Sequence, residues 1–138
     1  LSITATSVVE VAGAGVDDGV AGATITAGQT VYKKISDNKF YLADCDATAV
    51  GANAEIDNVY GIALNGAAVD QALSVQKTGT ITIGATTVVG VVYVQSATAG
   101  GIAPWGDLVS TDYVTIIGYA LTTSTIKLAI DILGVQEA

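Results

Sequence analysis

The fold is indicated most clearly by residues 125–133, TIKLAIDIL, where apolar and polar side chains alternate. Successive side chains of a β-strand point to opposite faces of the sheet, so a period of two predicts a strand with one buried face. That face carries Ile126, Leu128, Ile130 and Ile132. Residues 73–83 alternate in the same way around Gly79, which predicts one long strand with a bend or bulge at the glycine.

Further strands are predicted by composition. Residues 88–94 and 113–121 are nearly continuous runs of Val, Ile and Tyr, a pattern typical of strands that are central or lie at an interface. Residues 30–35 and 39–44 flank a Ser-Asp-Asn turn, which predicts a hairpin. The best helix candidate, residues 46–56, has no amphipathic stripe. The sequence therefore predicts an all-β protein, a compact antiparallel barrel or sandwich.

The two halves of the chain repeat short motifs in the same order. Val31-Tyr32 is followed by Val92-Tyr93, Leu42-Ala43 by Ile102-Ala103, and residues 60–64 (YGIAL) by residues 117–121 (IGYAL), as the offset falls from 61 to 57 residues. An internal duplication, giving a pseudo-twofold barrel or sandwich, would produce this order. Chance recurrence in a composition rich in Val, Gly and Ala would produce it equally well, so both explanations stay open.

Residues 1–27 differ from the rest because small residues and closely spaced glycines leave little bulk for a core. We expect them to form an extended N-terminal arm that packs on another surface, with residues 28–138 as the barrel or sandwich domain. The apolar residues of this arm are the predicted contacts with a partner or a neighbouring subunit: Val8, Val9, Val11, Val16, Val20 and Ile25.

Charge and reactive groups exclude several functions. The 138 residues include five Lys and 13 acidic residues, for a net charge of −8, so binding to nucleic acid or to an anionic membrane is not expected. The chain has no His and one cysteine, Cys45, which rules out His-based catalytic relays and imidazole metal sites. We expect no catalytic residues, no cofactor and no metal. The carboxylates of Asp17, Asp18, Asp44 and Asp46 are interpreted as solvated turn residues.

Trp105 is the only tryptophan and stands between Pro104 and Gly106. An exposed Trp in such a loop would anchor an interface. A Trp that covers the open end of the barrel would be equally consistent with the sequence, so the sequence leaves both positions of the Trp105 side chain open.

An ordered set of motifs connects the chain to a known family. They are residues 27–32 (AGQTVY), 42–44 (LAD), 61–68 (GIALNGAA), 79–84 (GTITIG), 100–104 (GGIAP) and 112–114 (DYV). In this order they resemble the small decoration, or cement, proteins of tailed-bacteriophage heads, over nearly the whole chain after residue 22. The motifs are turns and strands, so the specificity lies in their order.

The resemblance implies a non-enzymatic virion protein, a homotrimer on the outer surface of the capsid that reinforces it where major capsid proteins meet. In that family an N-terminal arm often contacts the capsid, which would place the contacts on residues 1–27. The alternative is a head-fibre or surface-adhesion module that binds host glycans, and this would require exposed aromatic residues such as Trp105.

Overall fold

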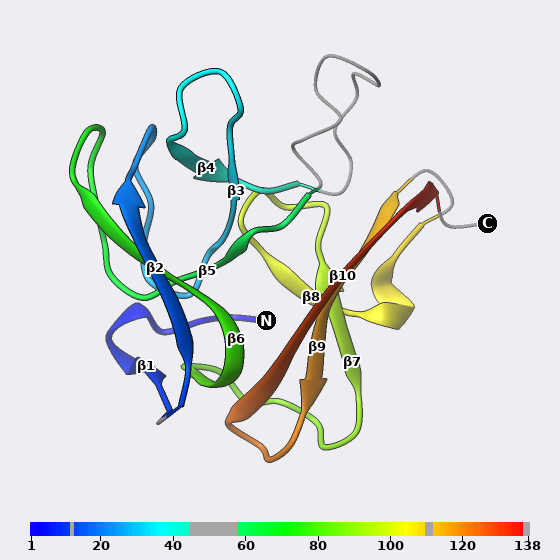
Figure 1. Cartoon of the computed structure of the whole chain (residues 1–138). Helices are drawn as coiled ribbons and strands as arrows, with labels where there is room; N and C mark the ends of the chain where they lie inside the picture. The colour runs from blue at the N-terminus through cyan, green and yellow to red at the C-terminus, as the bar shows by residue number, and fades with distance from the viewer. Residues whose placement is uncertain (12, 45–57, 110–111, 137–138) are drawn as a thin grey trace.

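The computed structural model describes residues 1–11, 13–44, 58–109 and 112–136, which form an antiparallel all-β fold, as predicted (Figure 1). Cys45, Asp46 and the candidate helix at residues 46–56 lie outside this part of the chain. The elements are η1 (Ala5–Ser7), β1 (Val8–Glu10), β2 (Gly15–Val20), β3 (Thr30–Lys33), β4 (Phe40–Leu42), β5 (Gly61–Ala63), β6 (Ala72–Ile83), β7 (Val92–Gln95), β8 (Ile102–Pro104), η2 (Trp105–Asp107), β9 (Tyr113–Ala120) and β10 (Thr125–Gln136).

Strand β6 connects two sheets. It bends at Gly79, whose φ of 86° lies in the left-handed region that favours glycine, so the bend predicted from the sequence is confirmed. Before the bend, β6 belongs to a first sheet with the order β2-β6-β5-β3-β4. After the bend, it belongs to a second sheet with the order β1-β6-β10-β9-β7-β8 (Figure 1).

The two sheets follow one plan. β2, β3, β4, β5 and the first half of β6 are repeated, in chain order and in pairing, by the second half of β6 and by β7, β8, β9 and β10. The registers agree as well, since Val31 pairs with Leu42 and Tyr93 pairs with Pro104. The repeated topology is the one that an internal duplication predicts, with β1 added to the second sheet only. A twofold arrangement is not seen, because Ile62 is buried between the sheets whereas its counterpart Tyr119 is exposed.

The register corrects two of the sequence equivalences. Tyr93 occupies the place of Val31, an offset of 62 residues (93 minus 31), so the hairpins are matched one or two residues away from the motifs quoted above. The last equivalence holds, because Gly28 N–H donates to Ala63 O and Gly90 N–H donates to Ala120 O, each at 2.8 or 2.9 Å. Ala63 and Ala120 are 57 residues apart, as the sequence indicated.

Two apolar clusters hold the sheets together. The larger one lies between the sheets and contains Tyr32 and Ile62 from the first, with Ile81, Tyr93 and Ile126 from the second. The smaller one covers the other face of the first sheet, where Phe40 packs edge-to-face on Tyr60 with ring centroids 5.3 Å apart. The first sheet is therefore covered on both faces, which explains why so small a sheet can be ordered.

Residues 1–27 are part of the sheets rather than a separate arm. β1 and β2 both pair with β6, and Ala21 and Ile25 are buried in the smaller cluster. The small side chains of this segment are explained by close packing, since a Cβ on Gly19 would overlap the Phe40 ring. The boundary between the two sheets therefore lies at Gly79, within β6, and not between residues 27 and 28.

The predicted strand at residues 88–94 begins late. β7 starts at Val92, and residues 88–91 form a turn in which Val91 N–H donates to Val88 O (3.1 Å) and Gly90 has a φ of 83°. Val88 and Val89 are exposed. The prediction was wrong at these residues because it gave more weight to the β-branched side chains than to Gly90, at which the chain reverses direction.

A buried polar network joins the two hairpins. Gln95 is fully buried; its Nε2 donates to Ala43 O (2.9 Å), and its Oε1 accepts from the hydroxyl of Thr30, also fully buried. Gly100 N–H donates to Ala43 O (2.7 Å) and Thr30 N–H donates to Gly100 O (3.0 Å). The β3–β4 and β7–β8 hairpins are therefore held against each other by hydrogen bonds as well as by apolar contacts.

Candidate functional site

An apolar groove lies on the surface between β1 and β2. We call it the valine groove; its volume is about 430 Å³. Val9 is 55% exposed and Val16 is 37% exposed, and both line this one groove, so apolar surface from two strands is brought together here. The residues that line it are Val8, Val9, Glu10, Val16, Leu64, Asn65 and Ser74.

Strand alternation explains why these valines face outward. In β1, Val8 points into the core and Val9 away from it. In β2, the less exposed positions are Gly15, Asp17 and Gly19, so Val16 and Val20 stand on the more exposed face with Asp18 between them. Val11, also exposed, follows just after β1. The structure thus places Val9, Val11, Val16 and Val20 on the surface of neighbouring segments.

Two residues predicted at the same interface are not available to a partner. Val8 packs in the cluster between the sheets and Ile25 in the smaller cluster, where it is 1% exposed. Both predictions fail for the same reason, since an apolar side chain that serves the chain's own core looks the same in the sequence as one that serves an interface. Leu64 and Asn65 are lining residues that the sequence did not indicate, because they come from the far end of β5.

The chemistry of the valine groove is that of a binding surface. Asn65 and Ser74 form a polar floor whose groups are already bonded: Asn65 Oδ1 accepts from Ser74 N–H (2.8 Å), and the Ser74 hydroxyl donates to Asp18 Oδ1 (2.7 Å). Glu10 is the only ionisable residue among those that line it. The groove can bury apolar side chains and attract a cation, while a paired acid and base for proton transfer are absent from its lining.

A second polar group lies at β2 and β6. The Tyr60 hydroxyl donates to Asp17, and Lys77 Nζ lies 3.6 Å from Asp17 Oδ2 and 4.5 Å from the Tyr60 ring centre. The Tyr60 hydrogen bond is the main cause that lowers the pKa of Asp17 below its ordinary value, and Lys77 adds to this effect. These contacts tie β2 to its neighbours and leave each charge next to a partner.

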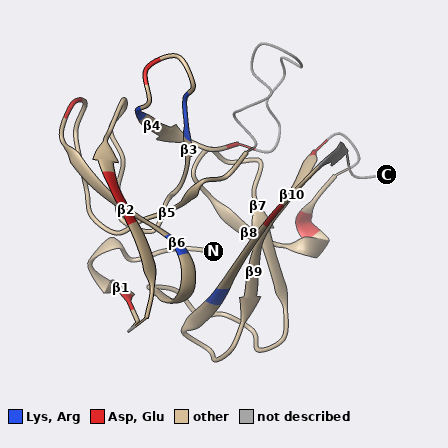
Figure 2. Cartoon of the chain, in the orientation of Figure 1, with Lys and Arg blue, Asp and Glu red and all other residues tan. Residues whose placement is uncertain are grey.

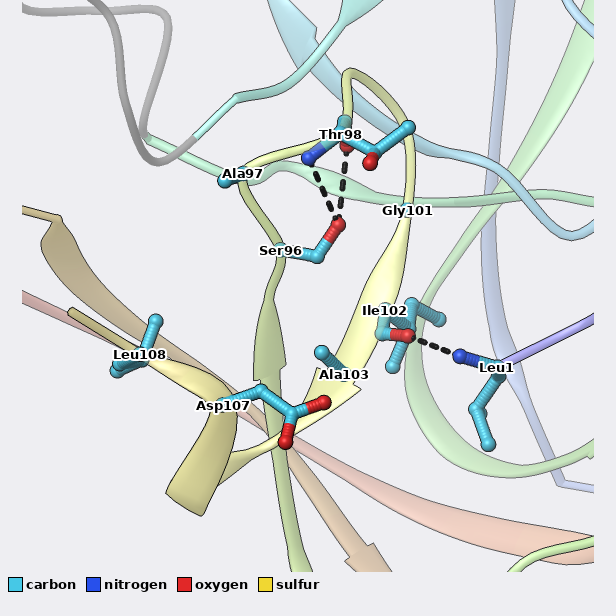
Figure 3. Close-up of a pocket in the computed structure, with 9 residues that line it drawn as sticks. All are labelled: Leu1, Ser96, Ala97, Thr98, Gly101, Ile102, Ala103, Asp107 and Leu108. Carbon is cyan, nitrogen blue, oxygen red and sulfur yellow. Dashed lines mark hydrogen bonds between the residues drawn. The ribbon is translucent and has the colours of Figure 1, made fainter.

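Trp105 begins η2 and is 42% exposed, so it does not form a buried cap. The nearby hollow, of about 370 Å³, is drawn in Figure 3. Asp107 is the only acidic residue that lines it, and the Ser96 hydroxyl is bonded to the backbone of Thr98 (3.0 and 3.1 Å). The Leu1 nitrogen donates to Ile102 O (2.7 Å) along one side. No set of polar groups converges in this hollow.

The chain has no match among known proteins in three comparisons, with protein-family models, with characterised proteins and with solved structures. Over residues 1–11, 13–44, 58–109 and 112–136, no group of three or more Cys, Asp or Glu side chains is placed to hold a metal ion. None of the helices in that part of the chain is long and apolar enough to cross a membrane.

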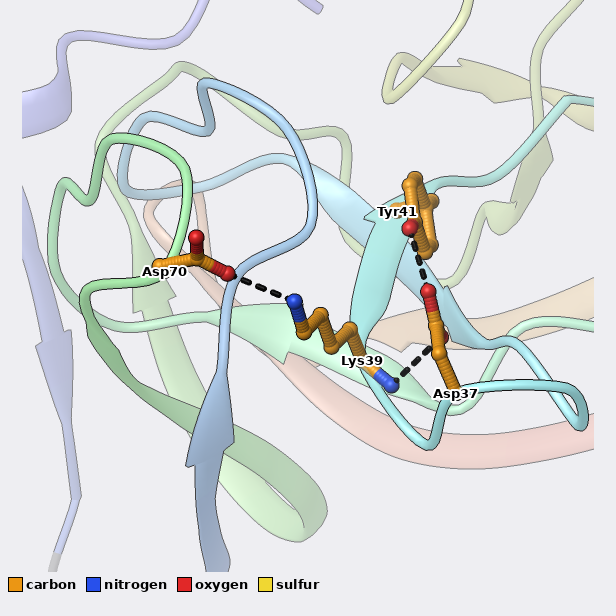
Figure 4. Close-up of polar contacts among 4 residues, drawn as sticks. All are labelled: Asp37, Lys39, Tyr41 and Asp70. Atoms are coloured by element: carbon orange, nitrogen blue, oxygen red, sulfur yellow. Dashed lines mark hydrogen bonds and ion pairs between the residues drawn. The ribbon is translucent and has the colours of Figure 1, made fainter.

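Polar contacts also secure the β3–β4 hairpin (Figure 4). Asp37 Oδ1 accepts from Lys39 N–H (2.9 Å) and Asp37 Oδ2 accepts from the Tyr41 hydroxyl (2.6 Å). Lys39 Nζ forms an ion pair with Asp70 (2.6 Å) in the β5–β6 turn. The Tyr41 hydrogen bond is the main cause that lowers the pKa of Asp37 below its ordinary value.

This shift predicts an acid-sensitive hairpin. A carboxylate whose folded pKa lies below its unfolded value stabilises the fold above the unfolded value, and this contribution is lost as the pH falls through the folded pKa. Asp37→Asn should therefore flatten the decrease in urea midpoint below about pH 4. Asp107→Asn, for which no such bond is seen, is the control and should keep the wild-type slope. An unchanged slope in Asp37→Asn would contradict the assignment.

Proposed function

We propose that this chain is a structural virion protein that binds the outside of a tailed-phage capsid as a decoration or cement protein, as a homotrimer and without enzymatic activity. The observation that carries the proposal is the valine groove, where exposed Val9 and Val16 lie together with no catalytic group among the lining residues. The resemblance of the ordered motifs to head decoration proteins supports it as well. The major capsid protein is the proposed partner.

Many weak contacts suit such a function. A standard protein interface buries about 1,600 Å², and a lattice of capsid subunits presents the same docking site many times over. The chain exposes few charges for its size, so placing it against a capsid desolvates few ions. Apolar strand surface with small side chains allows close contact, which favours reinforcement across a seam between subunits.

The outer face of the second sheet supports the proposed trimer. Val92 and Tyr119 are cross-strand partners there and are 37% and 43% exposed. Their counterparts in the first sheet, Thr30 and Ile62, are fully buried against the second sheet. Because the equivalent face of the first sheet is buried, we expect this face of the second sheet to be covered as well. Contact with sister chains would cover it.

The test is binding to capsids that lack the protein. Purified chain is titrated onto undecorated heads and the bound copies are counted by mass, with the mass of the free protein measured first to detect the trimer. We expect saturable binding, and at least roughly 30-fold weaker binding for the double variant Val9→Asp/Val16→Asp, because each new carboxylate would be desolvated at the contact. Val89→Asp, in the exposed 88–91 turn, is the matched control and should bind as the wild type does.

Other results would redirect the proposal. Absence of binding at saturating protein would contradict it. Normal binding by the groove variant together with loss of binding by Trp105→Ala would move the contact to η2, where the tryptophan is exposed. Glycan binding that depends on Trp105 would favour the alternative function, a head-fibre or adhesion module.

A further inference from the structure

The repeat leaves one strand position empty in the first sheet. In the second sheet, β1 pairs with the outer edge of β6 through Val9 opposite Thr82. Thr82 pairs on its other side with Thr125, and the matching residue of the first sheet, Asp18, pairs with Ser74. Over the described residues, β2 pairs only with β6, but just past its end Ala21 forms a parallel bridge with Phe40 of β4. The position that β1 fills in the second sheet is therefore unfilled beside the first part of β2, at Val16 and Asp18.

The backbone of β2 has the hydrogen-bonding groups that a strand needs. Leu64 N–H donates to Ser74 O (2.9 Å), so the backbone of Ser74 faces β5 and that of its neighbours, Leu73 and Val75, faces β2. Their partners, Gly19 and Asp17, therefore bond to β6. By the same alternation, Val16, Asp18 and Val20 direct their N–H and C=O groups away from β6. Next to Val20 this side meets β4, since Gly22 N–H donates to Phe40 O (2.8 Å), so the open edge consists of Val16 and Asp18.

The filled edge of the second sheet has the same geometry. Val11 N–H donates to Thr80 O (3.2 Å), so even-numbered residues of β6 beyond the bend face β1. Thr80 and Thr82 of β6 correspond to Val16 and Asp18 of β2. Thr80 and Thr82 lie opposite Lys127 and Thr125 of β10. Val16 and Asp18 lie opposite Gln76 and Ser74, which are the residues of the first sheet that match Lys127 and Thr125. The unfilled edge thus matches, residue for residue, an edge that accepts a strand in this same chain.

We propose that the open edge of β2 receives an extended strand of the capsid protein that carries a lysine or arginine opposite Asp18 and an apolar residue opposite Val16. The proposal rests on the proposed function for the source of the strand. Its chemistry comes from the edge: Val16 and Asp18 are exposed there, and Glu10 is exposed on β1 (Figure 2). Edge strands with free N–H and C=O groups are common acceptors for extended segments.

A second copy of this chain is a poorer occupant. An antiparallel pairing of β2 with β2 that is centred on Asp18 would set Asp18 opposite Asp18, and like charges directly opposite are destabilising in a sheet. The two chains would also each carry a net charge of −8. Charge complementarity therefore favours a basic strand from another protein.

The edge is tested on the free full-length protein by amide hydrogen exchange. Asp17 and Gly19 amides should exchange slowly and Val16 and Asp18 amides rapidly, since only the former are bonded to β6. The probe is a capped peptide of alternating valine and threonine with a central lysine, and it should slow the Val16 and Asp18 amides by about tenfold or more. A peptide with glutamate in place of lysine should not.

A charge exchange makes the test specific. Asp18→Lys, an exposed substitution, should reverse the preference so that the glutamate peptide protects the edge, whereas Asp107→Lys in η2 should keep the lysine preference. Slow exchange of the Val16 and Asp18 amides before any peptide is added, or no protection by either peptide, would overturn the proposal for the edge. Protection by peptide without protection on decorated heads would overturn only the capsid as the source of the strand.

Discussion

Replacing Gly118 with alanine is expected to lower the free energy of unfolding by about 3 kcal/mol or more. Gly118 lies in β9 between Tyr93 of β7 and Leu128 of β10, and a Cβ there would overlap the carbonyl oxygen of Lys127. A backbone oxygen in the middle of a ladder cannot move aside as the end of a side chain can. The strain would therefore separate β9 from β10 in the centre of the second sheet.

The direction of the change in stability distinguishes a steric clash of the new Cβ from the intrinsic preference for alanine in a strand. In a strand interior, alanine is otherwise preferred to glycine by roughly 0.5–1 kcal/mol. Gly61→Ala should show the same large loss, because Gly61 is the counterpart of Gly118 and a Cβ on it would overlap Gln76 O. Gly106→Ala, with no atom within 4 Å of the added Cβ, is the control and should change stability by no more than about 0.5 kcal/mol.

Urea unfolding followed by far-ultraviolet circular dichroism measures all three variants. Equal stability of Gly118→Ala and Gly106→Ala would contradict the close approach of β9 and β10. A large loss for Gly118→Ala with none for Gly61→Ala would show that the two sheets tolerate strain differently, and the equivalence of the two glycines would then be wrong.

The second large effect is expected at Gln95. Gln95→Leu should cost about 2–4 kcal/mol, because it leaves the Thr30 hydroxyl and a hydrogen-bond site on Ala43 O buried without this partner. The loss should fall on the contact between the two hairpins. Val94, the buried neighbour of Gln95 in β7, serves as a control through Val94→Ile, which keeps the network intact.

A double-mutant cycle identifies the network as the cause. Thr30→Val removes the hydroxyl that Gln95→Leu would leave without its acceptor, so the double variant should be more stable than the sum of the two single effects by about 1 kcal/mol. Additive losses would mean that Thr30 and Gln95 are not coupled. The cycle depends only on urea midpoints, so it is independent of any capsid assay.

The two sheets share one topology, and equivalent residues differ where one repeat packs on the other. At the position of Gln95 the first hairpin has Lys33, which is exposed, and at the position of Thr30 the second sheet has Val92, which is partly exposed. The buried polar pair therefore occurs only where one repeat packs on the other. Exposed Val16 occurs where β2, over the described residues, has β6 on one side and no strand on the other.

The sequence by itself determined most of the strands. Residues 73–83 and 125–133 were predicted because side-chain direction in a strand alternates locally, and Gly79 marked the bend because only glycine adopts its φ without strain. The candidate surface was predicted in part: Val9 and Val16 were identified because they are apolar residues in a segment of small ones. The repeat of residues 61–64 at 118–121 was also readable from the sequence.

Only the tertiary structure decided which valines face a partner, where the second repeat begins, and that β2 has an open edge. Val8 and Ile25 are as apolar as Val9 and Val16, and burial depends on which distant strands cover them. Thr30 and Gln95 are far apart in the sequence, and nothing local indicates their contact. The physical reason is that alternation is set by neighbouring residues, whereas strand pairing and burial are set by contacts between segments that the chain brings together only on folding.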